Sequence, residues 1–298
     1  MWWLIPAVSA NFFWSITNVI DKYIVANRVK NPYIFMSWLW LLTIVFVLLI
    51  PFVNFYVPEA KLFFWLVAAG VICFLASFPY IKAMQMEEVT RINIWWNIMP
   101  IFSLVIAWLT IGQKLNLGQL LALFLLLTGA ILGGIHIRRG GIAFSKAVWW
   151  LIFSCFLYTI YAVIFSFVSR LVPFVVALIW INIVGFTCAL LLFLSKKFRN
   201  DFMMEWKTVD SKLFGTVLLV SMLEHVAQFF NVWALSVGLA ALVYAMEGFQ
   251  AIFVFVIAMV VSFFKPLLLK EEMDRGNLFL KLAGVLFMAG GVAVLNLW

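Results

Sequence analysis

Long hydrophobic runs separated by short polar connections make up most of the chain. A helix that crosses a bilayer needs about 20 apolar residues. Ten runs meet this requirement, at approximately 2–24, 32–53, 62–84, 92–111, 118–136, 147–168, 173–194, 213–237, 240–264 and 278–297. The connections are short except for the polar stretch 195–212. The pattern therefore predicts ten membrane-spanning helices and no domain outside the membrane.

The chain also resembles itself at a constant shift of 151 residues, which places FSLVIA at 102–107 on FVFVIA at 253–258. We interpret the shift as two repeats of five helices, residues 1–140 and 141–298. Because five is an odd number, the second repeat would enter the membrane from the opposite side, as in inverted-repeat transporters. The predicted fold class is an all-α membrane protein with ten transmembrane helices in two inverted five-helix repeats.

Composition agrees with a polytopic membrane protein. Of 298 residues, 67% are hydrophobic and 11% are charged, with a mean hydropathy of +1.14. A soluble domain cannot bury that much apolar surface. The net charge of +8 comes from lysines and arginines in short connections, so it does not indicate nucleic acid. The three cysteines lie inside hydrophobic runs without metal-ligand spacing. We therefore expect no cofactor and no metal.

Basic residues gather on one side of the predicted topology. The odd-numbered connections and their helix ends hold 17 of the 20 lysines and arginines, and the even-numbered side holds only Lys61, Lys114 and Arg170. By the positive-inside rule, the odd-numbered connections are cytoplasmic. The chain is thus expected in the cell (plasma or inner) membrane with both termini outside.

Polar side chains repeat at helical spacing inside several predicted spans. Residues three or four apart share a helix face, and polar groups at membrane depth usually face the bundle interior or a cavity. Because such faces occur in both halves, we predict a shared solute cavity. Its predicted lining residues are Asn11, Ser15, Asn18, Asn97, Tyr158, Tyr161, Gln228, Asn231 and Tyr244. The alternative is that these groups only bond or pack between helices.

Two carboxylates, Glu224 and Glu247, lie well inside predicted spans, while the other ten acidic residues lie in connections or near helix ends. A charge at the centre of a spanning helix costs about 2.5–3.5 kcal/mol on insertion scales. Its presence favours proton coupling or binding of a cationic solute, and the adjacent His225 could exchange a proton or pair with Glu224. The alternative is a static hydrogen bond between helices. Lys22 and Arg91 are expected to extend to the membrane interface.

Several short motifs resemble the drug/metabolite transporter superfamily, specifically its ten-helix EamA-like branch. The matching residues are Trp14, Ser15 and Lys22 in the first span, Pro100, Gly112 and Gln119 around the fourth, and the small-residue pairs Ala122–Gly129 and Gly284–Gly291. Gln113 stands where the family has a glutamate, so no role of that glutamate is transferred.

The resemblance implies a secondary transporter that moves a small polar or cationic metabolite by alternating access, with proton coupling left open. Its partners would be a small-molecule solute and the lipid bilayer. Two alternatives stay open, a lipid-linked carrier or flippase of the same superfamily and a non-transporting membrane scaffold. An intramembrane enzyme is disfavoured because the only histidines, His136 and His225, lie on separate spans without an HExxH motif. The sequence leaves the oligomeric state open.

Overall fold

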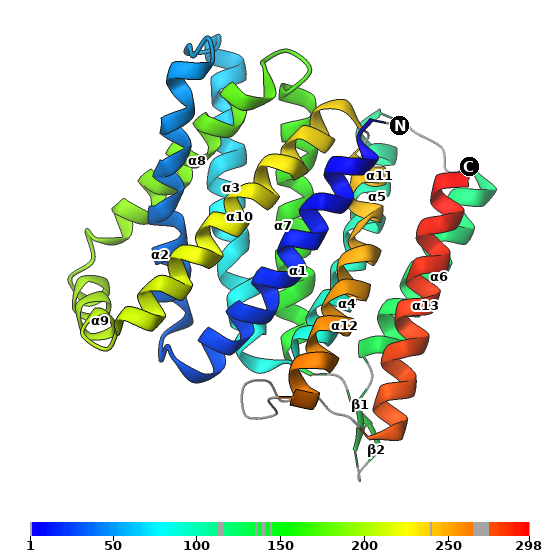
Figure 1. Cartoon of the computed structure of the whole chain (residues 1–298). Helices are drawn as coiled ribbons and strands as arrows, with labels where there is room; N and C mark the ends of the chain where they lie inside the picture. Colours follow the sequence, from blue (N-terminus) through cyan, green and yellow to red (C-terminus); the bar gives the residue numbers. More distant parts are fainter. Residues whose placement is uncertain are drawn as a thin grey trace.

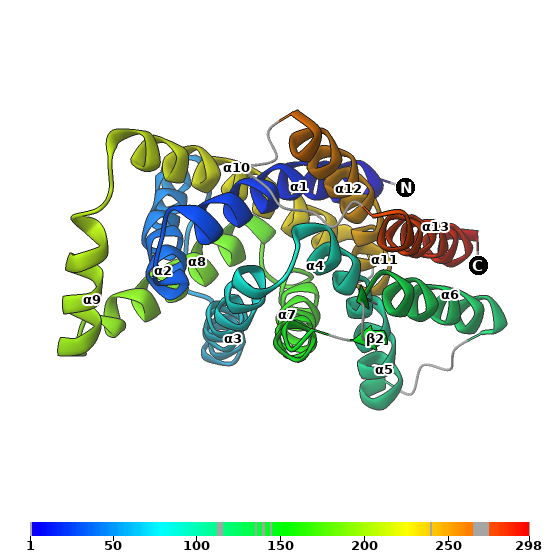
Figure 2. The same cartoon turned by 90° about the horizontal axis from the view of Figure 1, so that it is seen from below.

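A computed structural model describes residues 2–111, 116–134, 136–138, 141–143, 145–238, 240–264 and 274–297. Its long helices run side by side in one bundle, with α6 and α13 at one edge and α9 beyond the other (Figure 1, Figure 2). Helix α1 begins and α13 ends at the same end of the bundle (Figure 1).

The first half of the chain folds into six α-helices, two 3-10 segments and a short hairpin. These elements are α1 (Leu4–Asn27), α2 (Pro32–Leu42), η1 (Thr43–Phe52), α3 (Ala60–Met86), α4 (Val89–Trp95), η2 (Trp96–Ile98), α5 (Met99–Ile111), α6 (Leu117–Gly134), β1 (His136–Arg138) and β2 (Gly141–Ala143). The second half follows with α7 (Ala147–Val168), α8 (Phe174–Leu192), α9 (Lys196–Trp206), α10 (Ser211–Val237), α11 (Ala240–Ala245), α12 (Glu247–Phe264) and α13 (Arg275–Leu297).

Eight helical segments within the described residues are long and apolar enough to cross a membrane. They are Pro32–Phe52, Ala60–Met86, Val89–Ile106, Ala147–Val168, Phe174–Leu192, Ser211–Val237, Ala240–Phe264 and Arg275–Val294. The chain is therefore a multi-pass helical membrane protein, as the hydrophobic pattern predicts. All ten predicted spans coincide with helical segments, although α1 and α6 are not among the eight.

The β1–β2 hairpin is the departure from an all-α fold. It is antiparallel and places Ile137 opposite Ile142. The predicted fifth span ended at His136, but α6 ends at Gly134 and His136 belongs to β1. Glycine is a poor helix former, which accounts for the helix ending at the Gly133–Gly134 pair.

Two predicted spans are broken in their first halves, one in each half of the chain. The run 92–111 becomes α4, η2 and α5, because Pro100 removes a backbone donor and its ring clashes with the carbonyl four residues earlier. The run 240–264 is interrupted at Met246, where i to i+3 bonds replace the α-helical ones: Met246 N donates to Val243 O at 3.1 Å and Phe249 N to Met246 O at 2.9 Å. Under the 151-residue shift, Glu247 corresponds to Trp96, so the two breaks coincide.

The polar stretch 195–212 is not a simple connection, because it contains α9. Ser195 caps this helix by accepting a hydrogen bond from Phe198 N at 3.3 Å. Its aromatic face packs on the bundle, with ring centroids 6.1 Å apart for Trp206 and Trp38 and 4.8 Å apart for Phe202 and Phe193. A search for runs of 20 apolar residues misses such a helix, since it is apolar on one face only.

Three helix pairs carry much of the packing: α6 with α13, α3 with α7, and α1 with α10. Glycines allow α6 and α13 to approach closely. A Cβ atom on Gly129 would lie 2.6 Å from Met288 Cγ and 2.7 Å from Gly284 O, and one on Gly291 would lie 2.9 Å from Leu126 Cγ. Helices in membranes often associate through small residues in this way.

Candidate functional site: a buried polar cavity

A cavity of about 180 Å³ lies inside the bundle, between elements of the two halves. Its polar and aromatic lining residues include Trp14, Asn18, Asp21, Trp40, Thr43, Ser77, Tyr80, Trp96, Tyr158, Tyr161, Ser221, Glu224, His225, Gln228, Asn231, Tyr244, Glu247 and Gln250. Six of the nine residues predicted to line a cavity are among them, as are Glu224, His225 and Glu247. Both helix breaks reach the cavity, at Trp96 and at Glu247.

Asn11, Ser15 and Asn97 do not line this cavity. Each is buried and bonds to the backbone of its own helix segment: Asn11 Nδ2 donates to Ala7 O at 3.0 Å and Ser15 Oγ to Phe12 O at 2.6 Å. Asn97 Nδ2 donates to the carbonyls of Asn93 and Ile94 at 3.3 Å each. Helical spacing identifies the face that points inward, but a packed interface and an open cavity produce the same spacing.

Glu224 connects α10 to α1. Trp14 Nε1 donates to Glu224 Oε2 at 3.0 Å, and Thr17 Oγ1 donates to Oε1. The expected pairing with His225 is absent, since adjacent helical residues point in different directions. Instead, His225 Nδ1 bonds to Ser221 O in the preceding turn, and its ring lies 4.8 Å from Phe46. Glu224 therefore combines a bond between helices with a position on the cavity wall.

Glu247 is placed differently. It is the first residue of α12, directly after the break at Met246, and it is buried. Within the described residues its carboxylate accepts no hydrogen bond. The unpaired N–H groups of the first helical turn stabilise negative charge, so the broken helix provides a local reason for a carboxylate at this depth.

Asp21 is a third carboxylate on the cavity, and the sequence reasoning missed it. The first span was expected to end at residue 24, which placed Asp21 near a helix end, whereas α1 continues to Asn27. In the structure Asp21 is 2% exposed. Its spacing from Trp14 and Asn18, at intervals of four and three, was the available signal, because all three line the cavity.

Aromatic rings form part of the wall. The Trp96 ring lies between Tyr80 and Tyr158, with centroids at 5.3 and 5.5 Å. Tyr244 is fixed by donating from its hydroxyl to Tyr158 O at 3.1 Å. No lysine or arginine lines the cavity within the described part of the chain. The site thus combines three carboxylates with aromatic surfaces, which suits positively charged or polar molecules.

A chain of uncharged hydrogen bonds lies beside the cavity and joins four helices. Tyr80 Oη of α3 donates to Asn18 Oδ1 of α1, and Asn18 Nδ2 donates to Asn93 Oδ1 of α4, both at 2.8 Å. Gln250 Nε2 of α12 donates to the same Asn93 oxygen at 2.8 Å. We call these four residues the amide chain. It connects elements of both halves.

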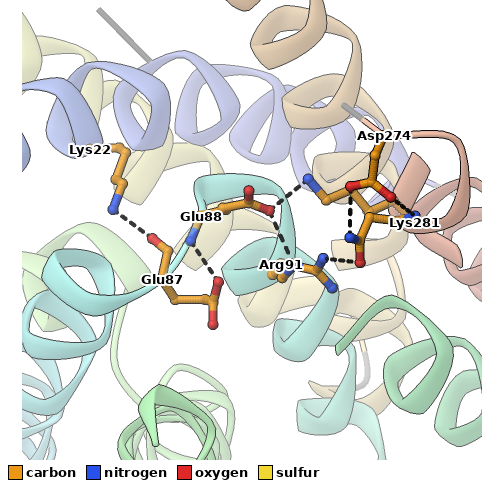
Figure 3. A network of polar contacts seen from close by, with 7 residues as sticks. Lys22, Glu87, Glu88, Arg91, Asp274 and Lys281 are labelled. Atoms are coloured by element: carbon orange, nitrogen blue, oxygen red, sulfur yellow. Dashed lines mark hydrogen bonds and ion pairs between the residues drawn. The ribbon is translucent and has the colours of Figure 1, made fainter. Parts of the chain in front are cut away.

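The end of the bundle that carries the α3–α4 connection is held by an ionic cluster (Figure 3). Glu88 accepts hydrogen bonds from Arg91 Nε at 3.1 Å and Lys281 Nζ at 2.6 Å, and Arg91 also donates to Asn277 Oδ1 at 3.0 Å. Arg91 is 1% exposed, so the expectation that it extends to the membrane interface is wrong. Partners supplied by the α3–α4 turn and by α13 account for its burial.

Lys22 also departs from the interface expectation. Its ammonium donates to Met84 O at 2.8 Å and to Glu87 O at 2.6 Å. A cation at the carboxyl end of a helix satisfies carbonyls that have no partner within the helix. Lys22 therefore joins α1 to the end of α3, next to the ionic cluster (Figure 3).

The fold and the cavity define a multi-pass helical membrane protein with an internal polar site. Residues 1–134 match the family model of the EamA-like transporter family, and this match confirms the predicted resemblance to the drug/metabolite transporter superfamily. A crystal structure of a second protein aligns with a TM-score of 0.63 and 17% identity, covering 98% of this chain and 95% of that chain. That likeness concerns the fold alone. No curated protein matches this chain.

Proposed function

We propose that the protein is a secondary transporter that moves a small polar or cationic metabolite across the membrane by alternating access. The observation that carries the proposal is the buried polar cavity at which both broken helices meet. Broken helices in corresponding positions of two repeats commonly form the midplane binding sites of transporters. The family match over residues 1–134 supports the same class.

Ten transmembrane helices in inverted repeats are part of this proposal. If residues 1–140 and 141–298 are repeats, α1 corresponds to α7 and α3 to α10. A two-fold axis that relates the two repeats would then place the α3–α7 pair on the α10–α1 pair, and both pairs pack closely. The α6–α13 pair converts into itself. These relations support a two-fold arrangement in which α1 and α6 also cross the membrane.

The proposed orientation follows the charge distribution. In the predicted topology, the odd-numbered connections and their helix ends hold 17 of the 20 lysines and arginines. Two of these connections, α1–α2 and α3–α4, lie at the end of the bundle opposite the start of α1 (Figure 1). We place that end in the cytoplasm and both termini outside, in the cell membrane.

Solute flux into proteoliposomes tests the proposed function. Purified protein would be reconstituted and supplied with labelled amino acids, amines and nucleosides, with and without a pH gradient. Saturable flux of at least one solute, absent from protein-free liposomes, is expected. Stimulation by the gradient would add proton coupling. Movement of a labelled lipid without solute flux would contradict this proposal in favour of the flippase alternative, and no movement of either would favour the scaffold.

A further inference from the structure

One buried oxygen in the cavity has no partner. Asp21 Oδ1 is buried and accepts no hydrogen bond within the described residues. Asp21 as a whole is 2% exposed, and it lines the cavity. A buried carboxylate without a donor is costly. Such a group points to a donor that a bound molecule supplies.

The surroundings of Asp21 define the charge of that molecule. Asp21 interacts electrostatically with Glu224 and with Tyr80. Gln250 Oε1 is a second buried cavity acceptor without a partner. The described lining includes three carboxylates and neither lysine nor arginine. Acceptors and negative charge therefore predominate, and an N–H-bearing cation complements both.

The walls define its organic character. Trp96, Tyr80 and Tyr158 line the cavity as a group of neighbouring rings, and aromatic rings attract cations. Within the described residues, no group of three or more His, Cys, Asp or Glu side chains is arranged to hold a metal ion. The site is thus built with rings rather than with a cage of oxygen ligands, which favours an organic ammonium over an inorganic cation.

We propose that the cavity binds organic monocations with an ammonium group, and that Asp21 determines this specificity by accepting a hydrogen bond from the ammonium. The inference rests on the proposed transport function and narrows its substrate class. Zwitterions such as free amino acids bind poorly, because the described lining has no lysine or arginine to pair with their carboxylate. Neutral analogues bind poorly because they leave Asp21 without a cationic partner.

Three single-ring probes of similar shape separate these classes: tyramine is cationic near neutral pH, tyrosine is zwitterionic and 4-ethylphenol is neutral. Isothermal titration calorimetry on purified full-length protein in detergent would measure the three dissociation constants. We expect tyramine to bind about tenfold or more tightly than either other probe. Equal binding of tyramine and 4-ethylphenol, tighter binding of tyrosine, or no binding of tyramine would overturn the proposed substrate class.

The matched variants are Asp21→Asn and Asp201→Asn. Both exchange an aspartate for an amide, but Asp201 lies on α9, outside the cavity lining. The readout is the ratio of the 4-ethylphenol and tyramine dissociation constants within each protein, which does not depend on the folded fraction. Asp21→Asn should lower that ratio about tenfold, and Asp201→Asn should leave it unchanged. An unchanged ratio in Asp21→Asn overturns the role of Asp21.

This binding measurement and the flux measurement can fail separately. A protein that transports amino acids without binding tyramine retains the proposed function and loses the inferred specificity. A protein that binds tyramine through Asp21 without any solute flux retains the site and loses the transport function.

Discussion

Glu224 and Glu247 both lie in hydrophobic runs of the sequence, but they differ in their hydrogen-bond partners. Both oxygens of Glu224 accept hydrogen bonds from α1, through Trp14 and Thr17. Glu247 accepts none within the described residues and sits at a helix start. The static hydrogen-bond alternative therefore applies more strongly to Glu224, and the solute or proton role more strongly to Glu247.

Replacement of Glu224 by glutamine should destabilise the fold. Glutamine keeps one oxygen that can accept the hydrogen bond from the Trp14 N–H. Its NH2 group then faces Thr17, so the Thr17 hydroxyl loses the carboxylate oxygen to which it donates. The expected loss is about 1–3 kcal/mol. Thermal unfolding of purified wild-type protein and Glu224→Gln compares the two. An unchanged melting temperature would show that the contact between α1 and α10 does not depend on this charge.

Replacement of Glu247 by glutamine should leave stability largely intact and reduce solute flux about tenfold or more, because no hydrogen bond within the described residues is lost while the cavity loses a charge. Proteoliposome flux and melting temperature, measured on the same preparation, separate the two effects. Glu59→Gln is the control, since Glu59 is an exposed residue directly before α3. Full flux in Glu247→Gln would contradict the assigned role.

Asp210 should give the protein an acid-sensitive contact outside the membrane. The Leu213 N–H, and then Arg28, donate hydrogen bonds that lower the pKa of Asp210 below its ordinary value. A carboxyl with a lowered pKa contributes stability above the unfolded-state pKa of about 3.9, and this contribution disappears as the pH falls through the folded-state value. The melting-temperature difference between wild type and Asp210→Asn should therefore be larger at pH 6 than at pH 3. An equal difference at both pH values would contradict the contact.

At the residue scale, the sequence identifies inward-facing polar positions better than it identifies their partners. The spacing of Asn18, Gln228 and Asn231 places them correctly on the cavity wall. The same spacing could not exclude Ser15, which bonds to its own helix. The prediction for Arg91 is wrong because its side chain has buried partners. These are Glu88 of the α3–α4 turn, which also contacts Lys281, and Asn277 of α13. The tertiary fold brings Asn277 and Lys281 to this turn, whereas Glu88 lies three residues before Arg91 in the sequence.

At the scale of elements, hydrophobic runs predict where helices lie and miss how they are interrupted. The break at Trp96–Ile98 has a local cause in Pro100. The break at Met246 has no proline beside it, and only the correspondence between the halves indicates it. The amphipathic helix α9 is not predicted from hydrophobic runs, because its overall composition is polar and only one face is apolar.

Packing of α6 on α13 offers a test with adjacent residues of one helix. A Cβ on Gly291 would lie 2.9 Å from Leu126 Cγ and 3.1 Å from Ala122 O, whereas a Cβ on Gly290 would meet nothing within 4 Å. Gly291→Ala should therefore cost about 1–3 kcal/mol through overpacking. Gly290→Ala should be neutral or slightly stabilising, because alanine favours the helix.

Melting temperatures of the two variants decide the matter, since both make the same chemical change one residue apart. Equal effects would indicate that the close approach of α6 and α13 is unimportant for stability. A loss confined to Gly291→Ala would support the importance of the small residue at this interface.

At the scale of the whole molecule, the ionic cluster binds α4 to α13 at one end of the bundle (Figure 3). Glu88→Gln removes the charge of the carboxylate that Arg91 Nε and Lys281 Nζ contact, and these two cationic side chains are only 1% and 3% exposed. Loss of one partner from a buried ion pair costs about 3–5 kcal/mol. We expect a marked fall in melting temperature.

Asp210→Asn at neutral pH is the control for this prediction. Its partner Arg28 is 28% exposed and Asp210 is 54% exposed, so the pair is solvated and its loss should lower the melting temperature much less than Glu88→Gln does. The amide also retains the ability to cap α10. Similar melting temperatures for Glu88→Gln and wild type would contradict the structural importance of the buried cluster.

The amide chain has a consequence for the electrical behaviour of the protein. Tyr80, Asn18, Asn93 and Gln250 join four helices without a formal charge. Moving one elementary charge across the membrane potential involves about 2.3 kcal/mol per 100 mV, whereas exchange of amide partners moves no net charge. Breaking and remaking this chain thus moves no net charge, and an electrogenic signal would come from the charged side chains and the solute rather than from the amide chain.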